Sequence, residues 1–479
     1  MAGKLLALGV TAGSHVAFWT EPTPWSVTAF FAVQRLDAVL VMLNTCLKGQ
    51  ELEKQLRCSE ADYLIVEDTT RQSVLLDVCR KGNTARLEGG VLHLGDSLNV
   101  RTIVLSELEA EAPLPPDPEP DEKRPAMMLF TSGTTSSEYK VVCSSGVQLA
   151  NSGRMKAKDM RITETDVVCC ALPMFHTFCI NCNILACAAS GASLVLPPDR
   201  HSKTLLTYIR RYQCTILTAV PSVYLTLAGR SRRENAGTDS LRRGIVGGAY
   251  CPPDQFREIE TGLGITLLPG LGQTEVIGGI TIASPDESLE VRSTTLGHFV
   301  DRLEGRLWFD PLAGEPDRPE IGEIHVRGPM VMLGYYQHGK IDPAVDADGW
   351  FHSGDLAWSD ADGNLHYAGR IKDLIIRGGE NIMPSEIEQT LSGDARIAGC
   401  KAVGVPDEHY GEVPCVCIIP RAGAKLTEDE IRQLMSARLA AYKVPKYVLF
   451  FQQFPYTSTG KISCKKLAVL AEQKIKEQK

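Results

Sequence analysis

The first side chains suited to chemistry form a run of hydroxyl residues around a glycine. The run consists of Thr131, Ser132, Gly133, Thr134 and Thr135, and it directly follows the apolar segment Ala126–Phe130. Glycine lets the backbone curl closely around an anion, and flanking hydroxyl and amide groups donate hydrogen bonds to phosphate oxygens. The sequence lacks the P-loop pattern G-x-x-x-x-G-K-[ST]. The run is therefore either a phosphate loop of another type or an ordinary polar surface turn.

Further charged and glycine-rich segments follow along the chain. Thr274 and Glu275 come after the strand-like segment Leu267–Leu268, where a carboxylate can hold Mg²⁺ against nucleotide phosphates. Asp355 offers a second carboxylate in a predicted turn. The remaining segments are Gly369–Asp373, Arg377–Pro384 and Thr459–Ile462.

Taken singly, several of these residues have a purely structural interpretation. Lys461, after Thr-Gly near the chain end, is typical of a solvated loop charge, and Gly378-Gly379 is typical of a turn. His176, after an apolar strand, is more often a structural histidine than a ligand. Cys179 and Cys182 have C-x-x-C spacing, but a structural zinc site needs four ligands and a second such pair is absent from the sequence, so we expect core cysteines.

The elements that position these residues follow a βα rhythm, which predicts an α/β fold with layers of mostly parallel sheet and helices on both faces. In the first hundred residues the expected elements are a helix over Trp25–Met42, a helix over Gln50–Cys58 and a strand over Tyr63–Val66. Further strands are expected at Asp166–Leu172, Ser193–Leu196 and Thr215–Ala219, and an antiparallel β-subdomain at Glu304–Asp310 and Glu323–Arg327. Beyond Arg370 the pattern changes to a small α+β domain, with strands at Leu374–Arg377, Gly399–Val405 and Val413–Pro420 and helices at Ser385–Ser392 and Thr427–Ala440.

Composition excludes several classes of partner. The formal net charge is −8, so the chain has no excess of cations for a nucleic-acid backbone. The longest apolar stretches contain charged or polar residues, so no membrane span is expected. Fifteen cysteines without regular spacing or a signal peptide predict reduced thiols and a cytoplasmic location. We expect a monomer or a homodimer.

In their order and spacing, the six segments resemble the adenylate-forming superfamily, which includes acyl-CoA synthetases, peptide-synthetase adenylation domains and firefly luciferase. The resemblance runs from about Leu5 to Leu467, and we expect the first elements of the family to be lacking. The resemblance implies that ATP, coenzyme A and a small carboxylic acid are the reactants and that Mg²⁺ is the metal cofactor. The acid attacks the α-phosphate, pyrophosphate leaves, and a thiol then displaces AMP from the acyl-adenylate.

The resemblance assigns the phosphate contacts. The hydroxyl run would wrap the β- and γ-phosphates, Thr274 would contact the α-phosphate and Glu275 would hold Mg²⁺. Lys461 would touch both the carboxylate and the α-phosphate, neutralising charge in the first step. Where the family usually has Gly-x-Pro-Lys-Gly, this chain has Ser136–Lys140. Lys140 serves as the phosphate contact if the loop slips by one residue, and otherwise that contact is lost.

The same resemblance assigns the nucleoside, acid and thiol contacts. Asp355 and Arg370 would hold the ribose hydroxyls, and Gly247, Gly248 and Ala249 would pack beside adenine and the acyl group. Leu271, next to Gly272, replaces an aromatic residue that commonly stacks on adenine. Phe175 and His176 would line the acid pocket. Lys372 would be the hinge between a domain of residues 1–371 and a mobile domain of residues 372–479, whose Gly378, Gly379 and Glu380 would line the pantetheine tunnel.

Three functions are compatible with this pattern. The leading one is an ATP-dependent acid–CoA ligase, because only 18 residues follow Lys461 and leave no room for a carrier domain. The second is a stand-alone adenylation enzyme that loads a separate carrier protein. The third is a nucleotide-binding pseudoenzyme, suggested by Tyr139 and Leu271. Fatty, aromatic and carnitine-like acids remain open as substrates.

Overall fold

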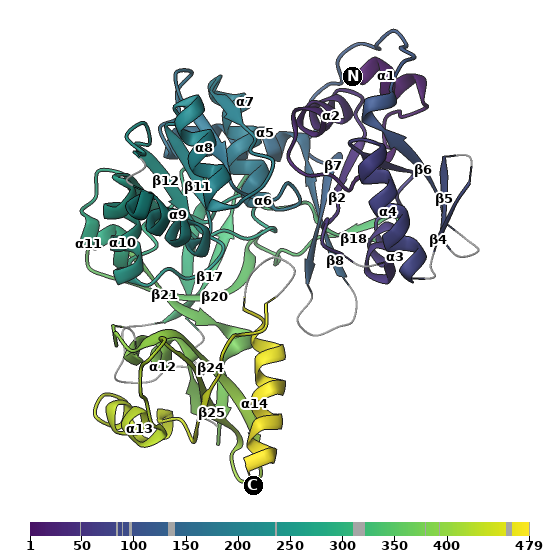
Figure 1. Ribbon diagram of the computed structural model, residues 1–479. Helices are drawn as coiled ribbons and strands as arrows, with labels where there is room; N and C mark the ends of the chain where they lie inside the picture. The colour runs from purple at the N-terminus through teal and green to yellow at the C-terminus, as the bar shows by residue number, and fades with distance from the viewer. Residues whose placement is uncertain are drawn as a thin grey trace. The chain divides into compact units, whose positions relative to one another are not determined.

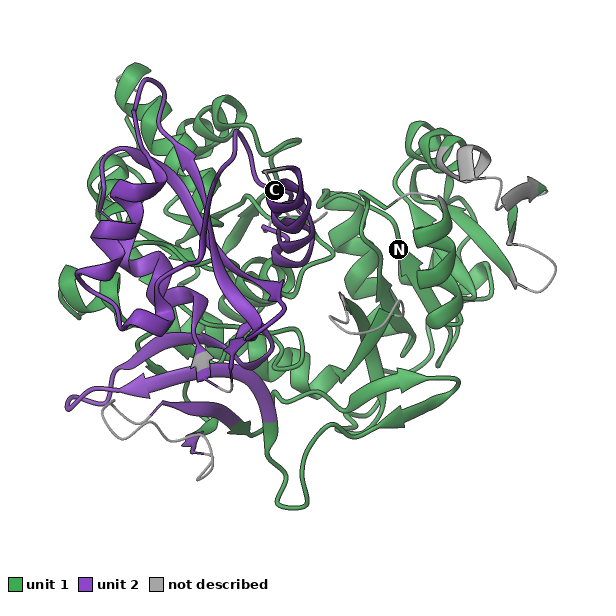
Figure 2. Ribbon diagram, turned by 90° about the horizontal axis from the view of Figure 1, so that it is seen from below, with its two compact units in different colours: residues 1–305, 326–351 green, residues 306–325, 352–479 purple. Residues whose placement is uncertain are grey.

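The structure is a computed structural model that describes residues 1–47, 49–82, 85–88, 90–94, 98–132, 139–234, 237–309, 321–378, 380–391, 393–456 and 462–478. Packing divides the chain into two compact units, coloured separately in Figure 2. Unit 1 comprises residues 1–305 and 326–351, and unit 2 comprises residues 306–325 and 352–479. Each unit is described by itself.

The first sheet of unit 1 has ten strands in the order β19-β18-β8-β7-β2-β1-β3-β6-β5-β4. Its centre is parallel and consists of β7 (Pro125–Ser132), β2 (Val39–Met42), β1 (His15–Phe18), β3 (Tyr63–Val66) and β6 (Leu98–Val104). Antiparallel strands extend both edges: β8 (Tyr139–Ser145), β18 (Gly334–Gln337) and β19 (Lys340–Asp342) on one side, β5 (Val91–Leu94) and β4 (Ala85–Glu88) on the other.

Helices cover both faces of this parallel centre because alternate residues of each strand are apolar on opposite faces. In β1, Val16 and Phe18 belong to the core under α1 (Ala2–Ala7) and α2 (Pro24–Arg35). Ala17 belongs to the opposite core, under α3 (Gly49–Cys58) and α4 (Thr69–Gly82) (Figure 1).

The predicted helix over Trp25–Met42 is wrong in its second half. Helix α2 ends at Arg35, Asp37 turns the chain with a φ of 58°, and β2 begins at Val39. All four residues of β2 are buried, so the strand is a continuous apolar run that periodicity does not separate from the preceding helix. The expected helix at Gln50–Cys58 and strand at Tyr63–Val66 are confirmed.

The second sheet of unit 1 is parallel throughout, with the order β10-β9-β11-β12-β13. Its strands are β9 (Val167–Cys170), β10 (Ser193–Val195), β11 (Ile216–Ala219), β12 (Arg243–Val246) and β13 (Thr266–Pro269). Helices α8 (Ser202–Tyr212), α9 (Pro221–Glu234) and α10 (Pro253–Leu263) pack on one face (Figure 1). Helices α5 (Gly146–Asp159) and α7 (Ala186–Ser190) pack on the other. The remaining elements are α6 (Thr177–Cys179), the π-helix Ile180–Leu185, β14 (Thr281–Ile282), α11 (Leu289–Thr294), β15 (His298–Phe299) and the 3₁₀ turn Leu105–Glu107.

Unit 2 contains two further sheets. One has the order β16-β17-β20-β21, formed by β16 (Glu304–Trp308), β17 (Gly322–Arg327), β20 (Phe351–Ser359) and β21 (Leu365–Arg370). The other has the order β23-β22-β25-β24, with β26 pairing with β25. Its elements are β22 (Ile375–Arg377), β23 (Glu380–Ile382), α12 (Pro384–Leu391), β24 (Ile397–Asp407), β25 (Gly411–Pro420), α13 (Glu428–Ser436), β26 (Tyr447–Phe450) and α14 (Cys464–Gln478), with 3₁₀ turns at Ile371–Asp373 and Ala441–Lys443.

The predicted fold class is confirmed: layered, mostly parallel sheets with helices, an antiparallel sheet, and a smaller α+β module at the carboxyl end. The two units are defined by which residues pack against one another, whereas the predicted boundary is the position of a hinge between two mobile parts. The division into residues 1–371 and 372–479 therefore stays a prediction. Among the described residues, no helix has both the length and the apolar character needed to cross a bilayer.

Candidate active site

The carboxyl edge of the second sheet collects three of the predicted segments. Phe175 and His176 follow β9, Gly247 follows β12, and Thr274 and Glu275 follow β13. Because the strands are parallel, all three segments leave the sheet at the same edge, which is where open α/β sheets bind their ligands. Spacing alone did not predict this convergence, since it depends on the strand order.

Gly247 is tightly enclosed. It is buried, and a Cβ atom added to it would lie 3.6 Å from the carbonyl oxygen of Gly270 and 3.6 Å from two carbon atoms of the Phe178 ring. Gly248 has a φ of 79°, a backbone conformation that favours glycine. A Cβ atom added to Gly248 would lie 3.4 Å from a methyl group of Val220. The carboxyl end of β12 therefore faces apolar side chains, and a methyl group added at Gly247 or Gly248 would be in van der Waals contact with them.

Phe175 and His176 lie together at the start of a buried helical segment. Their ring centroids are 4.6 Å apart, and His176 is the residue that precedes α6. The helix continues as the π-helix, whose two asparagines are fully buried. Asn183 accepts a hydrogen bond from Thr218 of β11 at 2.8 Å, and Asn181 accepts one from Ser152 of α5 at 2.6 Å. These bonds fix the helix that presents His176 and Phe178, and π-helices are frequent at functional sites.

Leu271 and Gly272 belong to a loop closed on β14. The backbone N–H of Leu271 donates to the hydroxyl of Thr281 at 3.2 Å, and its carbonyl accepts from Ile280 at 2.8 Å. The side chain of Leu271 is half-buried, while Gly272 is exposed. The loop therefore holds Leu271 at the same sheet edge as Glu275.

Two predicted phosphate and metal contacts, Lys140 and Glu275, are joined by a residue that the sequence did not indicate. The hydroxyl of Tyr335 donates to Glu275 Oε1 at 3.2 Å, and Lys140 Nζ lies 4.4 Å from the centroid of the Tyr335 ring. Thr131 is the strand partner of Lys140 across β7 and β8. No local pattern could indicate Tyr335, because its bond to Glu275 spans 60 residues.

The donor set on this unit fits the reactants of adenylation. Carboxylate and hydroxyl oxygens, as supplied by Glu275 and Thr274, are the hard ligands that Mg²⁺ prefers. The Lys140 ammonium and the Thr131 hydroxyl are suited to phosphate oxygens. The chemistry of Glu275, Thr274, Lys140 and Thr131 is therefore compatible with Mg²⁺ bound to a nucleoside triphosphate.

In unit 2, Asp355 and Arg370 form an ion pair. They are direct partners across β20 and β21, and Arg370 Nε donates to Asp355 Oδ1 at 2.7 Å. The Asp355 side chain is fully buried. Burial lowers the pKa of Arg370, but the charges of Asp355, Tyr367 and Asp373 and the hydrogen bond to Asp355 together outweigh burial, so the pKa is raised overall. The pair is thus a fixed charged group, and its contact with ribose stays a prediction.

The hairpin of β22 and β23 carries Gly378 and Glu380, and it follows Lys372, which is exposed in a 3₁₀ turn. Gly378 has a φ of 59°, and an added Cβ would lie 3.2 Å from the Tyr410 ring, so the turn favours glycine. Glu380 is exposed. The exposed carboxylate of Glu380 and Gly378, which has no side chain, therefore lie in the same short hairpin.

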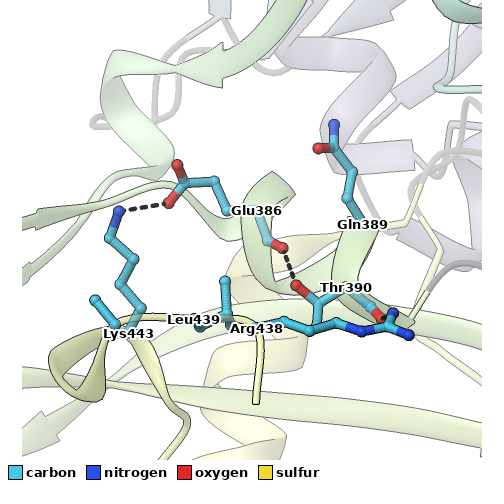
Figure 3. Close-up of a pocket in the computed structure, with 7 residues that line it drawn as sticks. Glu386, Gln389, Thr390, Arg438, Leu439 and Lys443 are labelled. Atoms are coloured by element: carbon cyan, nitrogen blue, oxygen red, sulfur yellow. Dashed lines mark hydrogen bonds and ion pairs between the residues drawn. The ribbon is translucent and has the colours of Figure 1, made fainter. Parts of the chain in front are cut away.

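The helix after this hairpin, α12, is anchored to the segment after α13. The ammonium of Lys443, whose side chain is 4% exposed, lies 3.2 Å from a carboxylate oxygen of Glu386 (Figure 3). Arg438 donates to the carbonyl of Thr390 at 3.2 Å. These residues line a shallow cavity of about 540 Å³. The contacts hold both ends of α12, which begins two residues after the hairpin.

Several predicted site residues lie outside the described part of the chain. They are Gly133, Thr134, Thr135, Gly379 and Lys461. Ser132 is described as the last residue of β7, opposite Tyr139. Ala249, beside Gly248, is exposed. The proposed roles of all these residues are predictions from the sequence.

A second group of metal-ligating side chains, Glu323, His325 and His352, lies in unit 2, with ligand atoms within 4.8 Å of one another. The two imidazole rings stack with centroids 3.8 Å apart and planes 14° apart. A metal ion lies in the plane of each imidazole that binds it, so near-parallel rings do not converge on one ion. The Trp308 ring also stacks with His325, at a centroid distance of 5.7 Å and an interplanar angle of 9°, which indicates an aromatic stack rather than a chelate.

The cysteines that resemble a C-x-x-C pair are packed in the core. Cys179 and Cys182 are 0% and 2% exposed and belong to apolar clusters. Burial raises the pKa of the Cys182 thiol to about 12, so the thiol stays protonated. The expectation of core cysteines at these two positions is confirmed.

Comparison with known proteins agrees with this geometry. A family model described as AMP-binding enzyme matches residues 1–336, and one described as AMP-binding enzyme C-terminal domain matches residues 386–461. A putative acyl-CoA synthetase, YngI of Bacillus subtilis, is 30% identical over 97% of this chain and 89% of its own. A feruloyl-CoA synthase of an Amycolatopsis species is 32% identical over 96% of this chain and 90% of its own.

A solved structure agrees as well. The o-succinylbenzoate coenzyme A synthetase of Bacillus subtilis, in complex with ATP and magnesium ion, superposes with a TM-score of 0.80 at 27% identity, covering 97% of this chain and 91% of the other. The family model covers well over half of the chain. The chain belongs to the AMP-binding enzyme family of adenylate-forming acid–CoA ligases.

Proposed function

We propose that this chain joins a small carboxylic acid to coenzyme A in two steps that consume ATP and release pyrophosphate and AMP. In the first step a carboxylate oxygen forms a bond to the α-phosphorus while the bond to pyrophosphate breaks. In the second step a thiol sulfur bonds to the acyl carbon while AMP leaves. The observation that carries the proposal is the contact of Tyr335 with Lys140 and Glu275, since Glu275 leaves the parallel sheet at the same edge as Gly247 and His176.

The difficulty of the first step is the approach of two anions, and cations with fixed hydrogen-bond donors lower its barrier. In this proposal Lys140 and Thr131 bind phosphate oxygens and Thr274 donates to the α-phosphate. Glu275 would hold Mg²⁺, which when bound neutralises phosphate charge. Lys461 would bind the carboxylate and the α-phosphate together, while Asp355 and Arg370 orient the ribose.

The acid we propose has an apolar or aromatic tail. Phe178 faces Gly247, and Val220 faces Gly248, each at van der Waals distance. Apolar walls select such tails by excluding water rather than by charge. The feruloyl-CoA synthase, whose name denotes an aromatic acid, is consistent with this class.

The test is pyrophosphate exchange on a panel of acids, followed by detection of CoA thioesters by mass. The panel contains short and long fatty acids, cinnamic and benzoic acids, and a zwitterionic acid as the polar member. We expect exchange and thioester formation with the apolar and aromatic members. Exchange with none of the acids would refute a ligase, and preference for the zwitterion would refute the proposed acid class.

A further inference from the structure

Tyr335 contacts both charged residues of the phosphate corner in unit 1. Its hydroxyl donates to Glu275 Oε1 at 3.2 Å, and its ring face lies 4.4 Å from Lys140 Nζ. One side chain thus touches a carboxylate with its polar end and an ammonium with its aromatic face. Few side chains other than tyrosine can make both contacts, because the donor and the π-face belong to one rigid group.

The register of the sheet explains how Tyr335 reaches Lys140. Tyr335 of β18 is the partner of Val142 of β8, and Lys140 lies two residues before Val142. Residues two apart on a strand share a face, so Tyr335 and Lys140 are diagonal neighbours on one face of the sheet. Thr131 is opposite Lys140 on the same face.

The backbone around Glu275 is tied to the segment that leads into β18. The N–H of Met332 donates to the carbonyl of Glu275 at 2.9 Å, and Val276 forms an isolated β-bridge with Val331. Glu275 and Tyr335 are therefore brought together by main-chain bonds as well as by their side chains. The contact is built into the fold and does not depend on one mobile side chain.

The negative charge of Glu275 favours the hydrogen bond that it accepts from the Tyr335 hydroxyl. A phenol is protonated at neutral pH, so the Tyr335 hydroxyl is a hydrogen-bond donor and the Glu275 carboxylate, 3.2 Å away, accepts.

We infer that Tyr335 is a positioning residue for the adenylation reaction: its hydroxyl orients the Glu275 carboxylate toward the metal ion, and its ring holds the Lys140 ammonium at the phosphate corner. The inference rests on the proposed function. A hydrogen bond to one oxygen of a ligating carboxylate fixes its orientation, and loss of such a partner costs about 10–100-fold in metal affinity. Tyr335 itself touches neither substrate nor metal in this role.

The test compares Tyr335→Phe with Tyr336→Phe. Tyr336 is the next residue on β18, so its side chain points to the opposite face, and its hydroxyl also donates to a carboxylate, that of Glu60. Both variants lose one phenolic hydroxyl bonded to a glutamate, and only one of them touches Glu275. Tyr335→Leu removes the ring as well as the hydroxyl, so its difference from Tyr335→Phe isolates the contact with Lys140.

Two readouts are measured on the full chain. The first is the Mg²⁺ concentration that gives half-maximal pyrophosphate exchange, and the second is binding of Mn²⁺ to the protein with a non-hydrolysable ATP analogue, followed by electron paramagnetic resonance. We expect Tyr335→Phe to raise both metal constants about tenfold, with a smaller change of kcat at saturating metal, and Tyr336→Phe to leave them unchanged. Tyr335→Leu should also raise the KM for ATP, and combining it with Lys140→Ala should add little more.

The inference is overturned if Tyr335→Phe and Tyr336→Phe bind Mn²⁺ like the wild type, or if both weaken it equally. A fold defect is recognised because it lowers the melting temperature of the apo-protein, which we expect to be similar for the two phenylalanine variants. If the wild type exchanges pyrophosphate with no acid, the proposed function fails. If the wild type is active and Tyr335→Phe has wild-type metal constants, only the role of Tyr335 fails.

Discussion

Replacing Gly247 by alanine probes the strand end that we place beside the acid. The new methyl group would lie 3.6 Å from the Gly270 carbonyl oxygen and from the Phe178 ring, which is an ordinary van der Waals separation. One buried methyl group contributes about 0.8 kcal/mol, and replacing glycine where alanine fits contributes about 0.4–1 kcal/mol through the unfolded chain. We therefore expect Gly247→Ala to unfold at the wild-type temperature or slightly above it.

The same methyl group would shorten the space available to the acid. A change of one methylene in an apolar pocket is worth about 1–3 kcal/mol, or about 10–200-fold in kcat/KM. We expect kcat/KM to fall by at least about tenfold for bulky aromatic acids and much less for a short acid. The assay is pyrophosphate exchange for the acid panel, with the melting temperature recorded for the same samples.

Gly278→Ala is the matched control, since it makes the same chemical change at a site where a Cβ atom does not fit. The added atom would overlap the side-chain amide of Asn181, and Gly278 has a φ of 96°. Backbone strain and overpacking each cost about 1–3 kcal/mol, so this variant should melt well below the wild type. Equal loss of stability in both variants, or unchanged kinetics for every acid in Gly247→Ala, would refute the placement of Gly247 at the acid.

Three further outcomes are expected. Lys461→Ala should abolish pyrophosphate exchange yet retain thioester formation from supplied acyl-adenylate and CoA, and loss of both half-reactions or of neither would contradict the role of Lys461 in the first step. Asp355→Asn should raise the KM for ATP more than Asp362→Asn, a change at an exposed turn, and equal KM values would contradict a nucleotide contact. Burial raises the pKa of Asp166, but hydrogen bonds from Arg242 and Thr215 outweigh it and hold the pKa below its usual value. The stability that this carboxylate contributes is therefore complete above about pH 4 and is lost as the pH falls toward its lowered pKa. The melting temperature of Asp166→Asn should fall less steeply with acid than that of the wild type, and parallel curves would refute this account.

Local patterns predicted most elements of the fold. The strand at Tyr63–Val66 has the predicted bounds, and the predicted helix over Ser385–Ser392 corresponds to α12, Pro384–Leu391. Such segments are short and bounded by polar residues, so the chain itself marks their ends. The run Trp25–Met42 failed because a helix and a strand buried on both faces follow each other with only a short turn between them.

The site was predicted as a list of segments but not as an arrangement. Thr274, Glu275 and His176 were indicated by residue type and by resemblance, whereas their meeting at one sheet edge depends on the strand order β9-β11-β12-β13. Tyr335 was missed because its partners lie far away along the chain and only the pairing of β18 with β8 brings it to Lys140. The pairing of strands that are far apart in the sequence produces no local pattern of residue types from which it could be predicted.

The parallel second sheet has a consequence for how new selectivity can arise. Four of its strands, β9 to β12, each deliver one loop to the shared edge and are followed by a helical segment that leads to the next strand of the sheet, as with Ala219 before α9 or Val246 before α10. A loop can therefore be exchanged for one of similar length without altering its neighbours' register. A library that varies only the residues between β12 and α10 should change which acids are accepted and, because Gly247–Ala249 are assigned to adenine as well, the KM for ATP together with them.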